Sequence, residues 1–232
     1  VAVLTMPGWA IWKTKWDWKS WLDLRLDSLA GAKGLVVDLR DNEGGDDCGD
    51  RILARLIDRP FTPPALEQRL RFQRTSKALD PYLDTWDDSF RTLGEKAAPL
   101  PNGFFLRPAG EDALTVAPAG KRLPVPVAVL TSPVNSSATF QFASSFRAIR
   151  GGKLYGRPTG GNRRGINGGC FFFVRLPASG LEFDLPLVGY FPTAPQPDAG
   201  ILPDVRVAPT IADIAARRDP VLERAAVDLA RG

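Results

Sequence analysis

Two turns in this chain carry the residue types that acyl-transfer chemistry requires. Ser137 lies in the stretch VNSSATFQFASSF, where a polar turn runs directly into an apolar pattern with helical spacing. A serine at this position is commonly an N-cap, but the position also sets a hydroxyl beside free amides at the positive end of a helix. Gly44 and Gly45, in DNEGGDD, permit positive φ and leave amides to face an anion. We therefore predict an oxyanion hole formed by the amides of both glycines and of Ala138.

The elements that would position these turns alternate between strands and helices. The runs GLVVDLR and VPVAVLT are short, apolar and β-branched, as buried parallel strands are, and a helical pattern follows each of them. GKLYG is typical of a third strand. The alternation predicts an α/β domain with a mainly parallel sheet flanked by helices. Ligands bind such sheets outside the carboxyl ends of the strands, which is where both turns fall.

Residues 61–100 do not fit this alternation. Prolines break the pattern at the start of this segment, and the remainder is polar with helical spacing. We predict a helical insertion or lid there, within one domain that spans residues 1–232. Further along, CFFFVRLP and LEFDLPLVGYFP read as two strands joined by a short turn.

Composition excludes several classes of function. The chain has 232 residues, of which 44% are hydrophobic, with 30 basic against 26 acidic side chains. The basic residues near the C-terminus alternate with acids, so we expect no nucleic-acid partner. No apolar run is long enough to span a membrane. Histidine is absent and Cys48 and Cys170 lack CxxC spacing, which argues against a Cys/His metal site and leaves open whether the two cysteines pair. We predict no metal and no cofactor.

Three motifs, in order along the chain, resemble those of the C-terminal processing peptidases, also called tail-specific proteases, a broad family that includes the tricorn core protease. They are GLVVDLRDNEGGDD, then VPVAVLTSPVNSSATFQFASSFRAIRGGKLYGRPTGG, then AGILPDVRV. The resemblance implies a crotonase-like or ClpP-like core and a serine endopeptidase that forms an acyl-enzyme on Ser137. It also implies protein or peptide substrates and a bacterial periplasmic or cell-envelope location.

The resemblance assigns further site residues around a glycine-rich loop. Thr159 and Gly161 match the end of the family's Gly-x-x-Thr-x-Gly strand. With Asn162 and Arg163, they would line the substrate. Asp198 is the acid nearest to the position of an orienting glutamate in the tricorn-like branch.

One departure from the family pattern leaves the base for Ser137 undetermined. Asn162 stands where the Ser-Lys branch has its lysine, and an asparagine side chain cannot accept a proton at neutral pH. The chain is therefore nearer the tricorn-like branch, whose histidine lies well upstream of the Gly-Gly turn. We expect such a histidine on a segment or domain that precedes the abrupt VAVLTMP start, with Lys153 as a second candidate base. The alternative functions are a catalytically inactive peptide-binding module, which Phe140 in place of the family's glutamate also favours, and an acyl-CoA enzyme.

Overall fold

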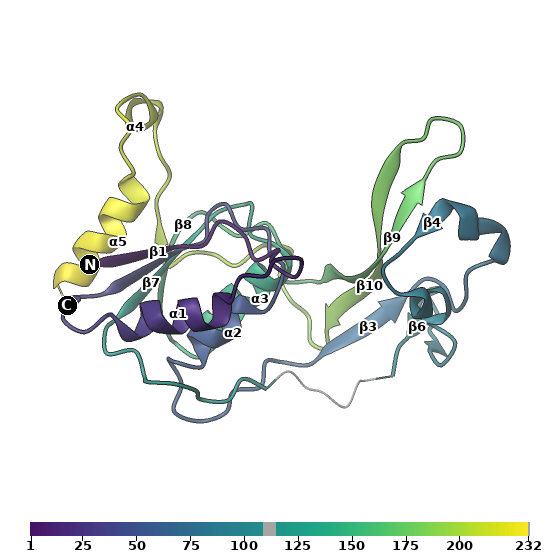
Figure 1. Ribbon diagram of the computed structural model, residues 1–232, viewed down its shortest axis with the longest axis horizontal. Helices are drawn as coiled ribbons and strands as arrows, with labels where there is room; N and C mark the ends of the chain where they lie inside the picture. Colours follow the sequence, from purple (N-terminus) through teal and green to yellow (C-terminus); the bar gives the residue numbers. More distant parts are fainter. Residues whose placement is uncertain (109–114, 232) are drawn as a thin grey trace. The chain divides into compact units, whose positions relative to one another are not determined.

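The chain forms two compact units. The computed structural model describes residues 1–108 and 115–231 (Figure 1). One unit consists of Val1–Pro63, Leu114–Asn162 and Asp198–Gly232, and the other of Pro64–Ala113 and Arg163–Pro197. We call them the parallel-sheet unit and the antiparallel-sheet unit. Among the described residues, no helix combines the length and the apolar character needed to cross a bilayer.

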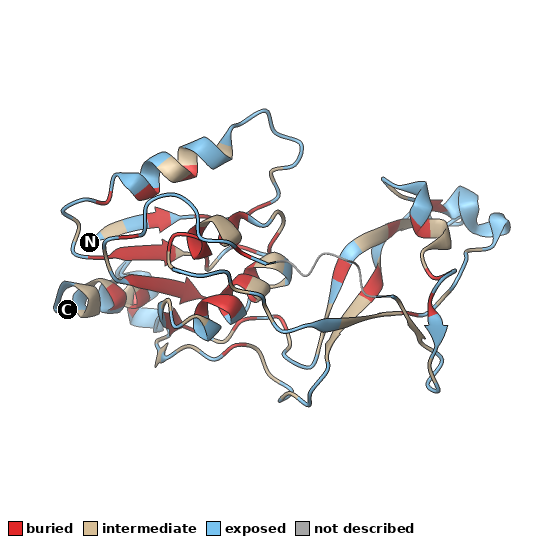
Figure 2. Ribbon diagram, turned by 90° about the horizontal axis from the view of Figure 1, so that it is seen from below, coloured by how far each residue is buried: buried red, intermediate tan, exposed pale blue. Residues whose placement is uncertain are grey.

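The parallel-sheet unit is built on a five-stranded sheet in the order β1-β2-β7-β8-β11, in which every pair is parallel. The strands are β1 (Ala2–Thr5), β2 (Leu35–Asp38), β7 (Val127–Thr131), β8 (Gly152–Gly156) and β11 (Val205–Arg206). Every residue of β7 is buried, and because successive side chains point to opposite faces, both faces of the sheet are covered. Figure 2 shows the buried residues concentrated in the strands of this sheet. The predicted α/β class with a mainly parallel sheet is confirmed.

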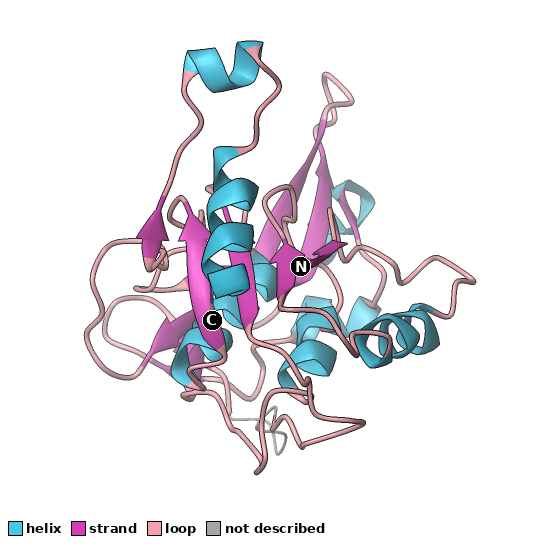
Figure 3. Ribbon diagram, turned by 90° about the vertical axis from the view of Figure 1, so that its left-hand side faces the viewer, coloured by secondary structure: helices cyan, strands magenta, loops and turns pink. Residues whose placement is uncertain are grey.

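Helices connect and cover these strands. They are α1 (Trp18–Asp27), α2 (Cys48–Leu53), α3 (Ser137–Ala148), α4 (Ile211–Ala215) and α5 (Pro220–Arg231). The strand order runs in one direction from β1 to β8, so right-handed crossovers place α1, α2 and α3 on the same face of the sheet. Helix α5 lies along the sheet and packs Val221 and Ala225 against side chains of β2, β7 and β8 (Figure 3).

An ion-pair network ties α5 to the end of β2. The Arg40 guanidinium contacts Asp38 of β2 at 2.6 Å and Asp219, immediately before α5, also at 2.6 Å. Each carboxylate accepts two hydrogen bonds from the guanidinium, a bidentate geometry that fixes direction as well as distance. The Asp-Leu-Arg motif therefore has a structural role, which is to hold α5 on the strand that leads into the Gly-Gly turn.

The antiparallel-sheet unit is a six-stranded sheet in the order β4-β9-β10-β3-β6-β5. Its strands are β3 (Leu66–Leu70), β4 (Leu83–Asp84), β5 (Ala98–Pro99), β6 (Phe105–Leu106), β9 (Ile166–Arg175) and β10 (Glu182–Pro192), and it also holds two 3₁₀ helices, η1 (Lys77–Tyr82) and η2 (Asp88–Thr92). Leu70, Phe172 and Val188 lie at the centre of its apolar core. The two strands predicted after the glycine-rich loop are confirmed as β9 and β10.

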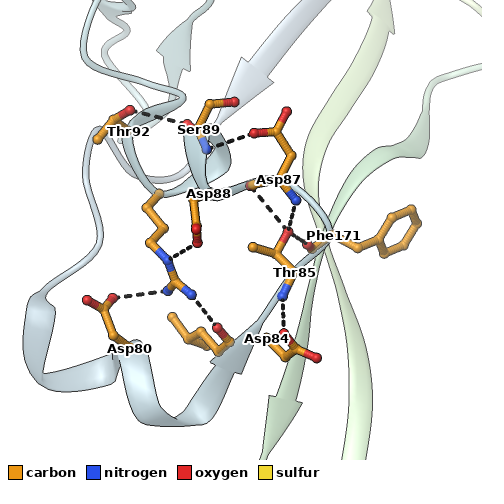
Figure 4. Close-up of polar contacts among 10 residues, drawn as sticks. Asp80, Asp84, Thr85, Asp87, Asp88, Ser89, Thr92 and Phe171 are labelled. Atoms are coloured by element: carbon orange, nitrogen blue, oxygen red, sulfur yellow. Dashed lines mark hydrogen bonds and ion pairs between the residues drawn. The ribbon is translucent and has the colours of Figure 1, made fainter.

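The segment around η1, β4 and η2 is held by polar contacts rather than by a long helix (Figure 4). Arg91 donates to Asp80 at 3.0 Å, to Asp88 at 3.1 Å and to the Leu83 carbonyl at 2.7 Å. Thr85 anchors the same segment to β9 through a 3.1 Å hydrogen bond to the Phe171 carbonyl. One arginine thus joins both 3₁₀ helices to the short strand between them.

The predicted helical insertion at 61–100 is wrong in its secondary structure and in its extent. Residues 66–70 form a strand that pairs with β10, and the helical turns that follow are short 3₁₀ segments. Helix propensity is a weak preference that tertiary pairing overrides, and Pro81 interrupts any longer helix. The second unit also takes in residues 163–197, so it is assembled from two separate parts of the chain.

Candidate active site

Ser137 occupies a strained position at the first turn of α3. It is exposed, and its φ of +46° is one that residues other than glycine adopt uncommonly. The N-cap of the helix is Ser136, whose hydroxyl donates to the Glu43 carbonyl at 2.8 Å instead of capping the helix. Among the described residues, no hydrogen bond involves the Ser137 hydroxyl. Ser137 is therefore not a helix cap, and its hydroxyl is available to react.

The Gly-Gly turn lies directly against Ser137. Gly44 has a φ of +116°, and a Cβ placed on it would lie 2.8 Å from Ser137 Cβ and 3.0 Å from the Ala138 nitrogen. Only glycine permits both this conformation and this approach. The structure thus brings together the two turns that the sequence predicted to meet, one after β2 and one after β7.

The two glycine amides are not equivalent. The Gly44 N–H donates to the Asn42 side-chain oxygen at 2.9 Å, so it is already engaged within the protein. Within the parts of the chain that the structure describes, the amides of Gly45 and Ala138 donate to no protein acceptor. The prediction is therefore wrong for the Gly44 amide, while Gly45 and Ala138 stay as candidate oxyanion donors. Gly44 contributes the close packing instead.

Asn42 is a buried residue that the sequence reasoning did not single out. It is 0% exposed. Its amide nitrogen donates to the Met6 carbonyl at 2.8 Å, and its oxygen accepts both the Gly44 amide and the Thr139 hydroxyl, the latter at 2.7 Å. One side chain thus connects the end of β1, the Gly-Gly turn and the first turn of α3. Its place two residues before the glycines was the only available signal.

Asn135 plays a similar part on the other side of the turn. It is also 0% exposed, and its side-chain nitrogen donates to the carbonyls of Leu39 at 2.5 Å and Asn42 at 3.1 Å. Its own carbonyl accepts the amides of Gly160 and Gly161. The glycine-rich loop is therefore attached to the turn that carries Ser137.

The structure places the other predicted site residues around this loop. Thr159 is buried and accepts the Ile201 amide at 2.8 Å, which gives it a structural role. Gly161 packs on Phe140, since a Cβ on the glycine would lie 2.5 Å from the ring. Phe140, which replaces the family's glutamate, is therefore a core side chain. Arg163 belongs to the antiparallel-sheet unit, where it donates to Gln196 at 2.7 Å.

Asn162 and Asp198 meet in the parallel-sheet unit. The Asn162 side-chain nitrogen donates to Asp198 Oδ1 at 2.6 Å. These are the two positions at which the family resemblance places a lysine and, nearby, an orienting carboxylate. A neutral amide donor thus stands where the resemblance places a lysine, and Asn162 cannot remove a proton from Ser137 as a lysine would.

Lys153 is not positioned to be the base. It lies near the start of β8 and pairs in register with Ala128 near the start of β7. Ser137 follows the opposite, carboxyl end of β7. In a parallel sheet all strands run in the same direction, so the start of β8 and the end of β7 lie at opposite ends of the strands. Lys153 is exposed and lies at the amino ends of the strands, away from the candidate site.

Both cysteines are free thiols. Burial, and secondarily the charge of Asp46, raise the pKa of Cys48 to about 12, so its thiol is unreactive at neutral pH. Within residues 1–108 and 115–231, no cluster of three histidine, cysteine or acidic side chains has the geometry to hold a metal ion.

One acid beside the Gly-Gly turn is destabilising when charged. Burial, and then the charge of Asp47, raise the pKa of Asp50 to about 6. The folded state therefore holds this proton up to about pH 6, whereas the unfolded chain releases it near 3.8, so this group makes folding less favourable as pH rises through that window. We expect Asp50→Asn to raise the free energy of unfolding at pH 7.5 by about 1–2 kcal/mol, and to have little effect at pH 3.5.

Urea unfolding followed by circular dichroism at the two pH values measures this difference. Asp41→Asn, at an exposed aspartate in the turn that precedes the two glycines, is the matched control for loss of one negative charge. An equal gain from both substitutions, or a gain from Asp50→Asn that is the same at both pH values, would contradict the assignment to Asp50 burial.

The fold and the site together define a class of protein. A strained serine at the start of a helix, packed against a Gly-Gly turn at the carboxyl edge of a parallel sheet, is the arrangement expected of a hydrolase. The chain belongs to peptidase family S41, whose family model matches residues 1–207. The resemblance drawn from the three motifs is thereby confirmed. No curated protein matches the chain.

Solved structures share the fold at low sequence identity. A candidate peptidase from Parabacteroides merdae is 23% identical, with 98% of this chain and 60% of that chain covered and a TM-score of 0.58. A mutant of CPAF is 16% identical, with 93% and 47% covered and a TM-score of 0.63. The tricorn protease is 16% identical, with 99% and 17% covered and a TM-score of 0.50. The chain thus spans 60% or less of the length of each of these proteins.

Proposed function

We propose that this chain is the core of a serine endopeptidase of the C-terminal processing type, which hydrolyses peptide bonds through an acyl-enzyme on Ser137. The observation that carries the proposal is the geometry of Ser137, which has a positive φ, an unengaged hydroxyl and direct packing against Gly44. Membership of a peptidase family supports protein substrates. The resemblance also motivates a periplasmic or cell-envelope location, which fractionation of the native host would test.

In the proposed reaction the Ser137 oxygen attacks the carbonyl carbon of the scissile peptide. The hydroxyl proton passes to a base, and the carbonyl oxygen becomes an oxyanion that accepts hydrogen bonds from the amides of Gly45 and Ala138. The N-terminus of α3 adds a favourable dipole at the same place. The base returns its proton to the leaving amine as the peptide bond breaks, and water then hydrolyses the ester on Ser137.

Asn162 stands where the Ser-Lys branch has its lysine and cannot accept a proton, so the base in this proposal is the imidazole of a histidine. These 232 residues contain no histidine. Added imidazole should therefore substitute for it. We expect imidazole to accelerate labelling of the chain by a fluorophosphonate probe by at least about tenfold, because general-base assistance contributes on the order of 10²–10⁴ to rates of this kind. Labelling is measured by in-gel fluorescence against imidazole concentration.

Ser137→Ala should abolish the labelling, whereas Ser144→Ala, at an exposed serine of the same helix, should leave it unchanged. The same labelling experiment is repeated on the full product of the gene. Labelling of that product without added imidazole would show that it carries its own base. If the folded chain and the full product both resist the probe, with and without imidazole, then Ser137 is not a nucleophile.

A second candidate function is a catalytically inactive peptide-binding module on the same fold. The hydrogen bond between Asn162 and Asp198 favours it, because an amide there replaces a group able to carry protons. This function predicts peptide binding without fluorophosphonate labelling under any condition, and the proposed peptidase predicts both.

A further inference from the structure

A tryptophan-lined cavity lies beside the Gly-Gly turn in the parallel-sheet unit. Its volume is about 190 Å³. Apolar and aromatic side chains form most of its wall: Met6, Trp9, Ile11, Trp16, Trp18, Trp21, Leu22 and Cys48. Two of these rings, Trp16 and Trp21, meet edge to face with centroids 5.2 Å apart. Trp16 is 49% exposed, so part of this aromatic wall is open to solvent.

The main chain of Trp9, which lines the cavity, is hydrogen-bonded to the Gly-Gly turn of the candidate active site. The Trp9 amide donates to the Gly44 carbonyl at 3.1 Å, and the Asp46 amide donates to the Trp9 carbonyl at 2.9 Å. Gly45, the candidate oxyanion donor, lies between these two contacts and forms a parallel bridge with Trp9. Gly44 in turn packs on Ser137. One turn of chain therefore separates the cavity wall from the reacting serine.

The dimensions of the cavity suit one large apolar side chain. An apolar protein cavity of about 150 Å³ accommodates benzene, whereas sites for drug-sized ligands begin near 300 Å³. A second copy of the chain or a membrane would instead require an interface of roughly 800 Å² per partner or a broad apolar face. The aromatic wall offers rings against which another ring packs at the usual centroid distances.

We propose that this cavity is a side-chain subsite that selects peptides with a phenylalanine-sized apolar residue at one fixed position near the scissile bond. The proposal rests on the proposed peptidase function, because it places the peptide main chain at the Gly45 amide. It names the class of substrate, which is a peptide segment with one bulky aromatic or aliphatic side chain. Polar or small side chains at that position would leave the tryptophan wall in contact with water.

Gly8 offers a way to close the cavity without disturbing the fold. It lines the cavity, is exposed, and would carry a Cβ with no atom within 4 Å, at a φ outside the left-handed region. Gly8→Phe would place a ring at the mouth of the cavity, and Gly8→Ala is the matched control. Trp16→Ala removes part of the wall, and Trp12→Ala, which is 62% exposed in the same segment and is not part of the wall, controls for loss of a tryptophan.

The test measures binding, separately from turnover, in the Ser137→Ala background. The probes are fluorescein-labelled hexapeptides of alanine and serine with one phenylalanine moved through each position, and fluorescence anisotropy gives Kd. We expect phenylalanine at one position to tighten binding at least about tenfold over the all-alanine peptide, as burial of one large apolar side chain predicts. Gly8→Phe and Trp16→Ala should remove this gain, and Gly8→Ala and Trp12→Ala should retain it.

The outcomes separate this inference from the proposed function. A tenfold preference that the cavity variants remove supports the subsite, even if the chain with serine 137 intact never hydrolyses a peptide. Hydrolysis with equal binding of all the peptides overturns the subsite and leaves the peptidase function in place. A preference for phenylalanine that Gly8→Phe does not change also overturns the subsite. So does a change of oligomeric state in the Gly8→Phe variant, measured by size-exclusion chromatography.

Discussion

Gly45→Ala is expected to lower the free energy of unfolding by about 3 kcal/mol or more, because the new Cβ adds overpacking to backbone strain. The methyl group would lie 2.3 Å from the Trp9 carbonyl carbon and 2.5 Å from the Ala10 nitrogen. These are backbone atoms held by the hydrogen bonds on either side of Gly45, so neither can move without breaking the bridge to Trp9. The φ of +131° is itself unfavourable for alanine. Urea unfolding monitored by tryptophan fluorescence reports the loss, since Trp9 is 1% exposed.

Gly31→Ala is the control that separates the cost of a positive φ from the cost of the steric clash with Trp9. Gly31 also has a positive φ, +86°, but a Cβ there would meet no atom within 4 Å. We expect this control to cost about 1 kcal/mol, the penalty of a left-handed conformation alone. Equal losses from the two substitutions would show that the contact with Trp9 contributes nothing, and that the turn has room to relax.

Much of the parallel-sheet unit could be predicted because its signals are local. The β-branched runs that became β2 and β7 are fully apolar over a few residues, and the turns after them fall at the carboxyl edge by the general rule for parallel sheets. The meeting of Gly44 with Ser137 follows from that topology, because β2 and β7 are adjacent strands. The resemblance of three ordered motifs added the role of Ser137.

Apart from the local pair β9 and β10, the antiparallel-sheet unit could not be predicted in the same way because its remaining pairing is not local. Strand β3 has a polar sequence, LEQRL, that suits a helix equally well, and its partner β10 lies more than 100 residues later in the chain. Strand preference depends on such neighbours more than on the residues themselves. The hydrogen bonds of Asn42 escaped prediction for a similar reason, since they join three segments that are distant in sequence.

The larger effect on the site is expected from Asn42→Ala. The substitution leaves the Gly44 amide, the Thr139 hydroxyl and the Met6 carbonyl without their partner in a fully buried place. Each unsatisfied buried group costs about 1–3 kcal/mol, so we expect a loss of about 3–4 kcal/mol in the free energy of unfolding, measured by urea denaturation. Partial relaxation and water entry keep the loss below the sum of the three.

Stability alone would not distinguish Asn42 as a positioning residue from an ordinary buried side chain. Without it, the Glu43–Gly44 peptide loses the hydrogen bond that fixes its N–H, while the Trp9 amide still holds the Gly44 carbonyl. Gly44 then shifts where it packs on Ser137 and the Ala138 nitrogen, which displaces the serine relative to the oxyanion donors. We therefore expect the imidazole-assisted labelling of Ser137 in folded Asn42→Ala to fall about 100-fold, as displacement of a catalytic group by about 1 Å does.

Thr139→Val is the matched control, because it removes one of the three hydrogen bonds to Asn42 and keeps the shape of the side chain. It should cost about 1 kcal/mol and leave the Gly44 amide bonded to Asn42, so that labelling falls much less than in Asn42→Ala. If the labelling of Ser137 fell in both variants in proportion to the loss in free energy of unfolding, the role of Asn42 would be to stabilise the fold and not to position the site. A loss of labelling confined to Asn42→Ala would show that its bond to the Gly44 amide holds Gly44 in its packed position against Ser137.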